Sequence, residues 1–586
     1  MNQMSVANRS RGAKRWGVAL AAVLVGTMVS SSATQAANRA PSKSKYGGEV
    51  IQAIDGTIAG FCFSNALPGG PLGTSRTIYE SLVERAANGK FIPYLAEKFT
   101  SSADAKEWTI TLRPGIKYSN GEEFNAANVK LNLDFGRSGF GTLNGAAFAT
   151  GSAASYPSTG VGVNANIMSV DVIDNLNVKV TLERGDSEFL GLMYRAGRYV
   201  MRAPAQIADP NTCQTNPIGT GPFMKQSYSP DELVVVKNPN YWRKDAAGVQ
   251  LPYLDKITFI NVKEASQRAA AVRKKTVDVG FFVTGDATFI KDLQQRKSAV
   301  TEYKSSQNQW GQWMPNVGKA NSPFKFQNCR LAAAFAIDWK LYNKVRLKGL
   351  GNVNGSIVGK TNPMYTLNGA PSFNVAKAKE FVAKCNTDLG TAAPFKVTLY
   401  ADTSSQSQNN VKFVGDMLTA AGIGLNNTYI AESAVLISKI YKGGGNDFDF
   451  AEGTPAEGDS IGYVIPFFVS KAFPTNSKSP VANTPYGKGY NTVIALGGHG
   501  NTAVDDAIYA AQAEPNAALA KKKYAEASAL LMSQGYTIPS VHVGMFVFTN
   551  NKSKLMGVGK LVNPDGKTYP AVAETKGLDY TGIYKG

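Results

Sequence analysis

The fold of this chain is decided by the segment 395–430, which reads FKVTLYADTSSQSQNNVKFVGDMLTAAGIGLNNTYI. Its hydrophobic pattern predicts a strand over Phe395–Tyr400, a helix over Asn409–Ala421 and a second strand over Gly424–Ile430. Two consecutive strands with a helix between them form a parallel pair, because the helix returns the chain in the same direction. The segment therefore predicts an α/β protein whose parallel sheet is covered by a helix.

The regions on either side of this segment have different patterns. Trp108–Arg113 alternates apolar and polar residues, and hairpin signals follow at Asn120-Gly121 and at Asp174-Asn175. Directly before the segment 395–430 we expect a helix over Val375–Cys385. After it we expect helices over Thr502–Glu514 and Ala517–Gln534 and a strand over Tyr536–Thr549. The chain is thus expected to be mixed α/β, with a β-rich first third and an α/β middle.

Composition excludes several classes of protein. The chain has 586 residues, of which 43% are hydrophobic and 10% aromatic, so it can form a packed core and is not disordered. It has two histidines and four cysteines, so we expect no His- or Cys-rich metal site and no cofactor. The formal net charge is +19, but the lysines are scattered and do not alternate with aromatic residues as in a nucleic-acid groove. We therefore expect no nucleic-acid partner.

The first residues have the layout of a secretory signal peptide. Four basic residues lie within positions 9–15, an uncharged run follows over Trp16–Val29, and small residues continue to Ala37. A run of this length is too short to span a bilayer as a helix, which takes about 20 residues. We expect residues 1–36 to be removed by cleavage after Ala36, which places the mature chain in the periplasm. No cysteine lies near the cut, so we expect no lipid anchor.

One motif suggests catalysis and defines an alternative function. Residues 458–462 read Gly-Asp-Ser-Ile-Gly and match the G-x-S-x-G nucleophile elbow, with Asp505 or Asp506 and then His542 in the chain order of a triad. The elbow needs a strand that ends directly before the serine, whereas the predicted strand Phe448–Phe450 ends earlier. An exported serine hydrolase that uses Ser460 is therefore the second hypothesis.

Several blocks of sequence, taken together, resemble a known family. They are Tyr94–Phe99, Trp108–Arg113, Pro114–Lys130, Asn216–Phe223, Asn238–Trp242, Pro323-Phe324 and Arg330–Asp338. In this order they resemble the dipeptide/oligopeptide-type solute-binding proteins of ABC importers, extracellular solute-binding family 5. The resemblance implies a receptor without catalytic residues that closes around a peptide or another small organic solute and delivers it to a membrane permease.

The resemblance also implies a domain organisation. We expect a two-lobed α/β architecture like that of type II periplasmic binding proteins, with a hinge and an inserted β-rich subdomain. Lobe I would cover residues 45–265 with the insertion at about 75–185, lobe II residues 266–492, and residues 493–586 would return to lobe I. The crossings are expected near Lys263–Ala269 and near Tyr490–Leu496. The protein is expected to be a monomer.

Ligand contacts are expected from loops that face the cleft. The candidate residues are Phe63, Asn65, Trp310, Trp313, Asn316, Glu457, Asp459 and Tyr490. Aromatic walls with a few polar groups suit an organic ligand, although core packing explains Trp310 and Trp313 equally well. Peptide-binding members place an amine-gripping Asp at a position that is Ala456 here. Peptides, sugars, opines and other solutes therefore remain open.

The remaining expectations are structural. Four cysteines allow three pairings, and we expect Cys62–Cys213 and Cys329–Cys385, because a bridge between lobes would obstruct hinge motion. Arg330 matches a helix-start arginine of the family and is expected to form an ion pair. Gly219 and Gly221 are expected to serve a tight turn and not a ligand.

Overall fold

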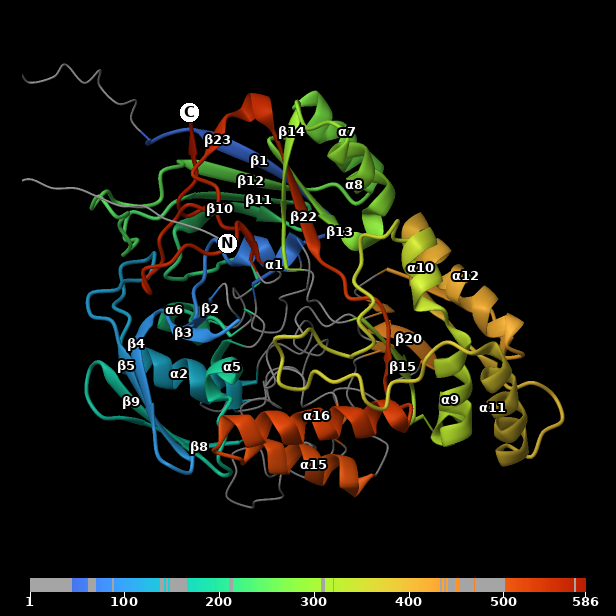
Figure 1. Ribbon diagram of the computed structural model, residues 1–586. Helices are drawn as coiled ribbons and strands as arrows, with labels where there is room; N and C mark the ends of the chain where they lie inside the picture. Colours follow the sequence, from blue (N-terminus) through green and yellow to red (C-terminus); the bar gives the residue numbers. More distant parts are fainter. Residues whose placement is uncertain are drawn as a thin grey trace, which may run out of the picture. The chain divides into compact units, whose positions relative to one another are not determined.

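Two lobes and a β-rich subdomain, each with its own core, organise the chain (Figure 1). A computed structural model describes residues 45–586 except positions 59, 62–69, 87–88, 138–141, 144–145, 148–165, 195–196, 198, 210–213, 307–310, 320, 433–434, 437–438, 441–447, 454–467, 470–500 and 574–575. A seven-stranded sheet forms the first lobe, and a three-stranded sheet with two-stranded pairs forms the second.

The sheet of the first lobe has seven strands. In spatial order they are β10 (Phe223–Ser229), β11 (Glu232–Lys237), β12 (Lys256–Asn261), β1 (Glu49–Ile54), β13 (Val279–Val283), β22 (Met545–Asn550) and β14 (Val300–Lys304). β1 runs parallel to β12 and β13, whereas β22 runs antiparallel to β13 and β14. Because successive side chains of a strand point to opposite faces, Phe281 and Phe282 enter different cores. Helices α7 (Ala265–Lys274) and α8 (Ala287–Gln294) pack in the core that contains Phe282.

A β-rich subdomain has a separate core. Its antiparallel sheet has the order β4 (Ala96–Ser101), β5 (Glu107–Leu112), β9 (Asn177–Leu182) and β8 (Ile167–Val172). The alternation expected around Trp108 is confirmed, because Trp108, Ile110 and Leu112 are all buried on one face. The second predicted hairpin is also confirmed, since a carboxylate oxygen of Asp174 accepts from the backbone N–H groups of Leu176 and Asn177.

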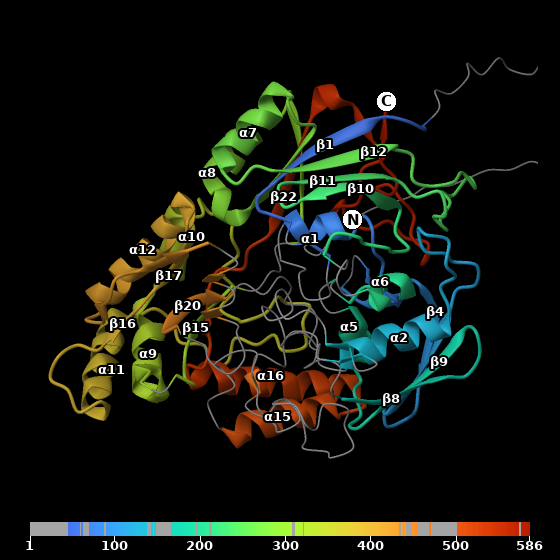
Figure 2. The same cartoon turned by 180° about the vertical axis from the view of Figure 1, so that it is seen from behind.

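The second lobe contains the predicted βαβ unit. Its sheet pieces are β15 (Gln312–Pro315), β20 (Phe450–Gly453), β21 (Ile538–Pro539), β16 (Lys396–Val397), β17 (Tyr400–Asp402), β18 (Gly424–Leu425) and β19 (Tyr429–Ala431). The pairs β16–β18 and β17–β19 are parallel and are joined through α12 (Ser405–Ala420), which confirms the crossover. The other helices are α9 (Gln327–Ala336), α10 (Trp339–Val345), α11 (Val375–Asp388), α15 (Thr502–Gln512) and α16 (Ala517–Ser533) (Figure 2).

The core clusters show where the chain changes lobe. Residues 265–304 pack with the seven-stranded sheet, whereas residues from α15 and α16 pack in the core of the second lobe. The single strand expected over Tyr536–Thr549 is wrong, because it is divided into β21 in one lobe and β22 in the other. This packing favours crossings between Lys304 and Gly311 and between Val541 and Met545, later than the boundaries 265 and 492 that the sequence suggests.

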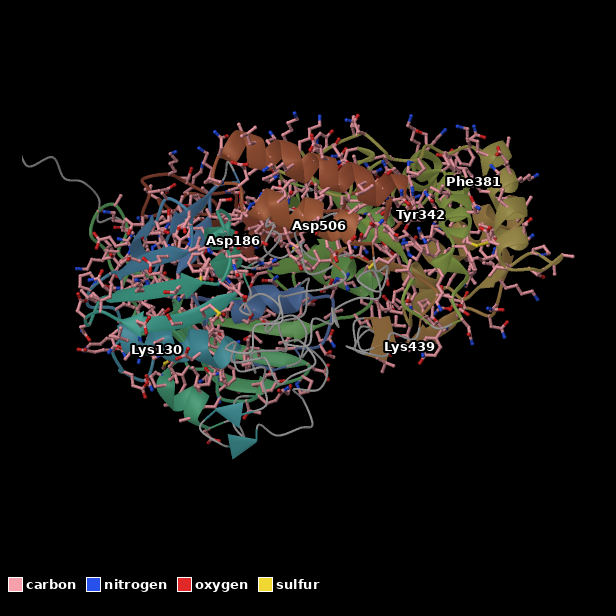
Figure 3. All side chains as sticks on the ribbon, turned by 90° about the horizontal axis from the view of Figure 1, so that it is seen from below. Lys130, Asp186, Tyr342, Phe381, Lys439 and Asp506 are labelled. Atoms are coloured by element: carbon pink, nitrogen blue, oxygen red, sulfur yellow. A yellow bond between two sulfur atoms is a disulfide. The ribbon has the colours of Figure 1, made fainter. Side chains whose placement is uncertain are left out.

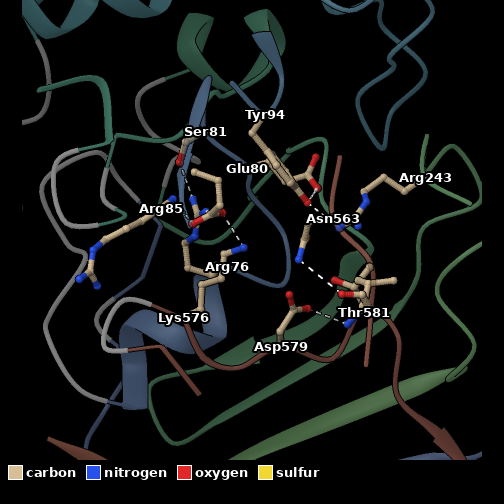
Figure 4. A network of polar contacts seen from close by, with 12 residues as sticks. Arg76, Glu80, Ser81, Arg85, Tyr94, Arg243, Asn563, Lys576, Asp579 and Thr581 are labelled. Atoms are coloured by element: carbon tan, nitrogen blue, oxygen red, sulfur yellow. Dashed lines mark hydrogen bonds and ion pairs between the residues drawn. The ribbon is translucent and has the colours of Figure 1, made fainter. Parts of the chain in front are cut away.

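The buried carboxylate of Glu80 forms hydrogen bonds with several of the sequence blocks that suggested a family. The Glu80 carboxylate accepts hydrogen bonds from Trp242 Nε1 at 2.8 Å, Thr220 Oγ1 and the Tyr241 hydroxyl at 3.0 Å, and the Tyr94 hydroxyl at 3.3 Å. Glu80 and Tyr94 are labelled in Figure 4. Desolvation raises the pKa of Glu80, while the hydrogen bond from Trp242 and the charge of Arg243 oppose that rise. These blocks therefore contribute to the fold.

A second buried carboxylate lies in the same network. Glu84 pairs with Arg76 at 3.0 Å and with Lys576 at 2.5 Å, so it connects the subdomain to a segment near the C-terminus. Both cations are labelled in Figure 4. Burial by itself raises the pKa of Glu84, but Lys576 and Arg76 lower it below its ordinary value. The two cations thus keep the buried carboxylate ionised.

Gly219 and Gly221 lie against the backbone of Ile78. A Cβ atom would stand 2.2 Å from the Ile78 carbonyl oxygen at Gly219 and 2.5 Å from it at Gly221. No side chain fits at that distance. The close approach of two backbones explains both glycines, which agrees with a structural role.

The expectation that Arg330 forms an ion pair is wrong. Its guanidinium donates instead to the carbonyl oxygens of Phe324 and Gln534 at 2.8 Å and of Lys325 at 2.9 Å. The Tyr536 ring lies 4.3 Å from the guanidinium carbon. Arg330 therefore satisfies backbone acceptors where the start of α9 meets the end of α16.

We expect Glu80→Ala to lower the free energy of unfolding by about 3–5 kcal/mol, because several buried donors lose their acceptor. Glu80→Gln keeps a side-chain acceptor and should lose less. Urea unfolding followed by circular dichroism measures both variants. A loss below about 1 kcal/mol for Glu80→Ala would show that the donors find other partners.

The predicted disulfide Cys329–Cys385 is present and joins α9 to α11 across a sequence separation of 56. On the chain-entropy model a loop of this length stabilises the fold by about 4 kcal/mol. We expect the double variant Cys329→Ala/Cys385→Ala to lose about that much in urea unfolding under oxidising conditions. Under reducing conditions the difference from the parent chain should largely disappear, and a persistent difference would attribute it to packing.

Candidate functional site

The edge of the second lobe that faces the first lobe is formed by the carboxyl ends of β17, β19 and β20; we call it the interlobe edge. Lys263 follows β12 of the first lobe; its Nζ donates to Thr403 Oγ1 at 2.6 Å and pairs with Glu432 at 3.0 Å. Thr403 and Glu432 are the first residues after β17 and β19. β20 runs parallel to β17, as the bridge between Leu399 and Phe450 shows. Ligands of α/β sheets bind beyond the carboxyl ends of parallel strands, so this edge is the candidate site.

Two of the segments predicted from sequence adjoin this edge. Gln312 at the start of β15 pairs with Gly453 at the end of β20. The Gly311 carbonyl also accepts from the Ser540 backbone N–H at 2.9 Å. Gly311 and Gly453, which border these two segments in sequence, therefore lie at the interlobe edge.

Trp313 is buried in the core of the second lobe. Only 2% of its surface is exposed, and its ring centroid lies 4.9 Å from that of Phe450 and 6.3 Å from that of Trp339. Its register partner on β20 is Glu452. Directly opposed residues of an antiparallel pair share a face of the sheet, so Trp313 packs beneath the position of Glu452.

Asn316 lies at the end of β15 away from the interlobe edge. Its Nδ2 donates to the Phe448 carbonyl at 2.7 Å, and its Oδ1 accepts from the backbone N–H groups of Gly318 and Lys319. The structure therefore does not bring Asn316 to the residues of the edge. Ligand contacts by Trp313 and Asn316 stay predictions, and Phe63, Asn65, Trp310, Glu457, Asp459, Tyr490 and the pair Cys62–Cys213 lie outside the described residues.

Two carboxylates of the edge were missed by the sequence reasoning. Asp402 is the last residue of β17 and Glu452 the third residue of β20. Desolvation and, after it, the charge of Asp402 raise the pKa of Glu452 to about 7. Glu452 is nevertheless exposed to solvent. Both could have been identified as candidates from the sequence, because each is a carboxylate within or just after a predicted strand.

The lobes also meet at a second place. Gln512 Nε2 on α15 donates to the Asp186 carboxylate of the subdomain at 2.9 Å, and the Arg184 guanidinium carbon lies 4.0 Å from the ring centroid of Tyr509. Figure 3 labels Asp186 and the neighbouring α15 residue Asp506. Desolvation raises the pKa of Asp186. This contact joins the subdomain to the helices of the second lobe.

A cavity beside the Glu80 network is too small for an organic ligand. Its volume is about 20 Å³, and Arg76, Tyr79 and Asp579 are among its lining residues. That volume accommodates about one water molecule. The network is therefore part of the scaffold.

The triad proposed as an alternative is not assembled within the described residues. His542 is fully buried, and its Nε2 lies 2.8 Å from the Ser356 carbonyl oxygen. Ser460 lies outside the described residues. The part of the chain that the structure describes contains no group of three or more His, Cys, Asp or Glu side chains arranged to hold a metal ion. Among the same residues, no helix combines the length and apolar character needed to cross a membrane.

Comparison with known proteins identifies related sequences and folds. Residues 90–474 match the family described as bacterial extracellular solute-binding proteins, family 5 Middle. The chain is 24% identical over 482 residues to the glutathione-binding protein GsiB of Salmonella typhi, which covers 80% of this chain and 83% of that protein.

Two solved structures show the same fold. The PBP AgaA from A. tumefaciens R10 in complex with agropinic acid has a TM-score of 0.73 and 19% identity over 92% of this chain and 99% of that one. The periplasmic binding protein DppA from Helicobacter pylori in complex with the peptide STSA has a TM-score of 0.71 and 18% identity over 92% and 98%. The predicted two-lobed α/β architecture is confirmed. The matched proteins are binding proteins and not enzymes, so the hydrolase alternative is not supported.

We expect Trp313→Ala to lower the free energy of unfolding by about 3–5 kcal/mol, the scale for truncating a buried Trp. Trp313→Phe keeps most of the ring contacts and should lose less. Urea unfolding measures both variants. A loss below about 1 kcal/mol for Trp313→Ala would contradict the core position and leave ligand contact as the role of this side chain.

Proposed function

The chain belongs to the bacterial extracellular solute-binding proteins of family 5, and we propose that it binds a peptide or a peptide-like small organic solute between its lobes. Members of this family are the solute-binding components of ABC importers, which confirms the resemblance seen in the sequence. The protein therefore works with membrane permease subunits. It is a receptor and not an enzyme.

One observation supports the proposed binding region. The interlobe edge combines the carboxyl ends of three strands with Gln312 and Gly453, which border in sequence two segments predicted to contact ligand. Lys263 of the first lobe already reaches this edge, so a solute there could contact both lobes. Contacts to both lobes are what a ligand needs to favour a closed arrangement.

The class of solute is proposed from relatives and chemistry. The relatives bind glutathione, the peptide STSA and the opine agropinic acid. All three are small, polar and rich in carboxyl and amide groups. We therefore propose that the solute is a short peptide or a condensation product of amino acids, in preference to a sugar.

The location of the mature protein follows from the same proposal. Cleavage after Ala36 would release a monomeric receptor into the periplasm, with no cysteine near the new terminus to carry a lipid. The N-terminal sequence of the secreted protein and its mass by light scattering test these two points.

We expect a thermal-shift screen of the mature protein with glutathione, di- and tripeptides and opines to identify a stabilising solute. A ligand that binds only the folded state at 100 times its Kd stabilises it by about 2.7 kcal/mol. Small-angle scattering should then show closure, and chromatography should recover the solute unchanged. Chemical turnover of the solute, or stabilisation by oligosaccharides alone, would contradict the proposal.

A further inference from the structure

The β-rich subdomain meets helices α15 and α16 of the second lobe through the loop 184–188; we call this the acidic contact. Gln512 Nε2 on α15 donates to the Asp186 carboxylate at 2.9 Å, and the Arg184 guanidinium carbon lies 4.0 Å from the ring centroid of Tyr509. Tyr509 and Gln512 are three positions apart on α15 and therefore lie on the same face of the helix. The acidic contact thus joins the lobes at a second place besides the interlobe edge.

The loop that carries the acidic side chains is fixed to the subdomain. A Cβ atom at Gly185 would stand 2.1 Å from the Asp104 carbonyl oxygen, so the two backbones touch there. The Asp186 backbone N–H donates to the Ala105 carbonyl oxygen at 3.1 Å, and the Asp186 carboxylate accepts from the Glu188 backbone N–H at 2.9 Å. The two carboxylates therefore move with the subdomain, and the helices opposite them move with the second lobe.

The Glu188 carboxylate is the least compensated charge of the acidic contact. Asp186 accepts two hydrogen bonds, whereas no described residue donates to the side chain of Glu188, which is partly buried. The charge of Arg184 acts on Asp186, but the charge that acts on Glu188 is that of Asp186. Desolvation and, after it, this like charge raise the pKa of Glu188 to about 7, and desolvation raises the pKa of Asp186.

Two buried hydroxyl groups of α16 belong to the same contact. Tyr524 and Ser528 lie one helical turn apart and are fully buried, and within the described residues neither hydroxyl oxygen has a hydrogen-bond partner. After desolvation, the charges of Asp186 and Glu188 raise the pKa of Tyr524, so its hydroxyl lies near both carboxylates. These hydroxyls leave the buried negative charge uncompensated, although buried polar groups normally have partners.

A proton relieves this arrangement better than a metal ion does. One proton removes the repulsion between two neighbouring carboxylates and the cost of desolvating the second charge. A metal ion needs several ligands, and the described residues contain no group of three or more His, Cys, Asp or Glu side chains that could hold one. Separation of the lobes is the other way to relieve the charge, because it returns the carboxylates to water.

We propose that the acidic contact is a proton-dependent switch between the lobes: it stays joined while Asp186 and Glu188 carry a proton between them and separates when both are ionised. The switch needs no solute, so it holds or fails independently of the proposed function. The other titratable or charged groups around the two carboxylates are Asp104, Arg184, Asp505, Tyr509 and Tyr524.

The direction of the pH effect follows from the raised pKa of Glu188. In the joined arrangement this pKa is about 7, whereas a separated carboxyl titrates near its ordinary value of 4.5. A group whose pKa is raised by a contact favours that contact below the raised pKa and weakens it as the pH rises through that value. For one linked proton, the ratio of joined to separated chains should fall about tenfold between pH 6 and pH 8.

Distances between two spin labels on the full mature chain measure this ratio. Lys98→Cys places one label on an exposed position of β4 in the subdomain, and Lys521→Cys places the other on an exposed position of α16. Double electron–electron resonance should show a short distance that dominates at pH 6 and loses population at pH 8. Glu188→Gln removes the titratable charge and should keep the short distance at pH 8. Glu107→Gln removes the same charge from an exposed ion pair of the subdomain and should behave like the parent chain.

Equal distance distributions at pH 6 and pH 8 in the parent chain would overturn the inference, and so would a pH dependence that persists unchanged in Glu188→Gln. If that variant does not fold, carbon NMR titration of the glutamate side chains decides. Gln512→Ala removes a bond across the contact, so it should lower the pKa of Glu188 towards its ordinary value. A pKa that is the same in Gln512→Ala and in the parent chain would show that the contact and the proton are not linked.

Discussion

The first lobe depends on the buried Glu80 carboxylate. A buried carboxylate must be supplied with donors, and four side chains from three segments supply them here. The segments around Thr220 and around Tyr241 and Trp242 lie on either side of the β10–β11 hairpin. Their bonds to Glu80 fix that hairpin relative to the subdomain. This requirement explains why these blocks are recognisable in the sequence although they form no ligand cavity.

The ion pair that joins the lobes at the interlobe edge differs in kind from this buried network. Lys263 and Glu432 have 42% and 65% of their side-chain surface exposed. Ion pairs at such exposure stabilise by about 0–1 kcal/mol, so they position the lobes without locking them. Buried networks within a lobe and weak contacts between lobes are what hinge motion requires, since each lobe moves as a unit.

The features that were predicted correctly from the sequence are those that a local pattern of residues determines. The βαβ unit, the hairpin at Asp174 and the family were all recognisable from residues close together in the chain. The pairing Cys329–Cys385 followed from the lobe assignment. Glu80 and Glu452 were missed because their environments are created by residues up to 162 positions away or by strand register. Arg330 was misassigned for the same reason, since its acceptors are carbonyl groups that only the tertiary structure brings together.

The net charge of the chain and the net charge of the described residues at the interlobe edge have opposite signs. A formal charge of +19 attracts anions over a distance, but salt screens such attraction beyond about 8 Å. At the interlobe edge the described acidic groups are Asp402, Glu432 and Glu452, and the neighbouring cation Lys263 is already paired with Glu432. A solute at this edge is therefore subject mainly to the nearest carboxylates. The composition of the whole chain does not determine the sign of its ligand, because the selecting charges are the few that the strand ends bring together.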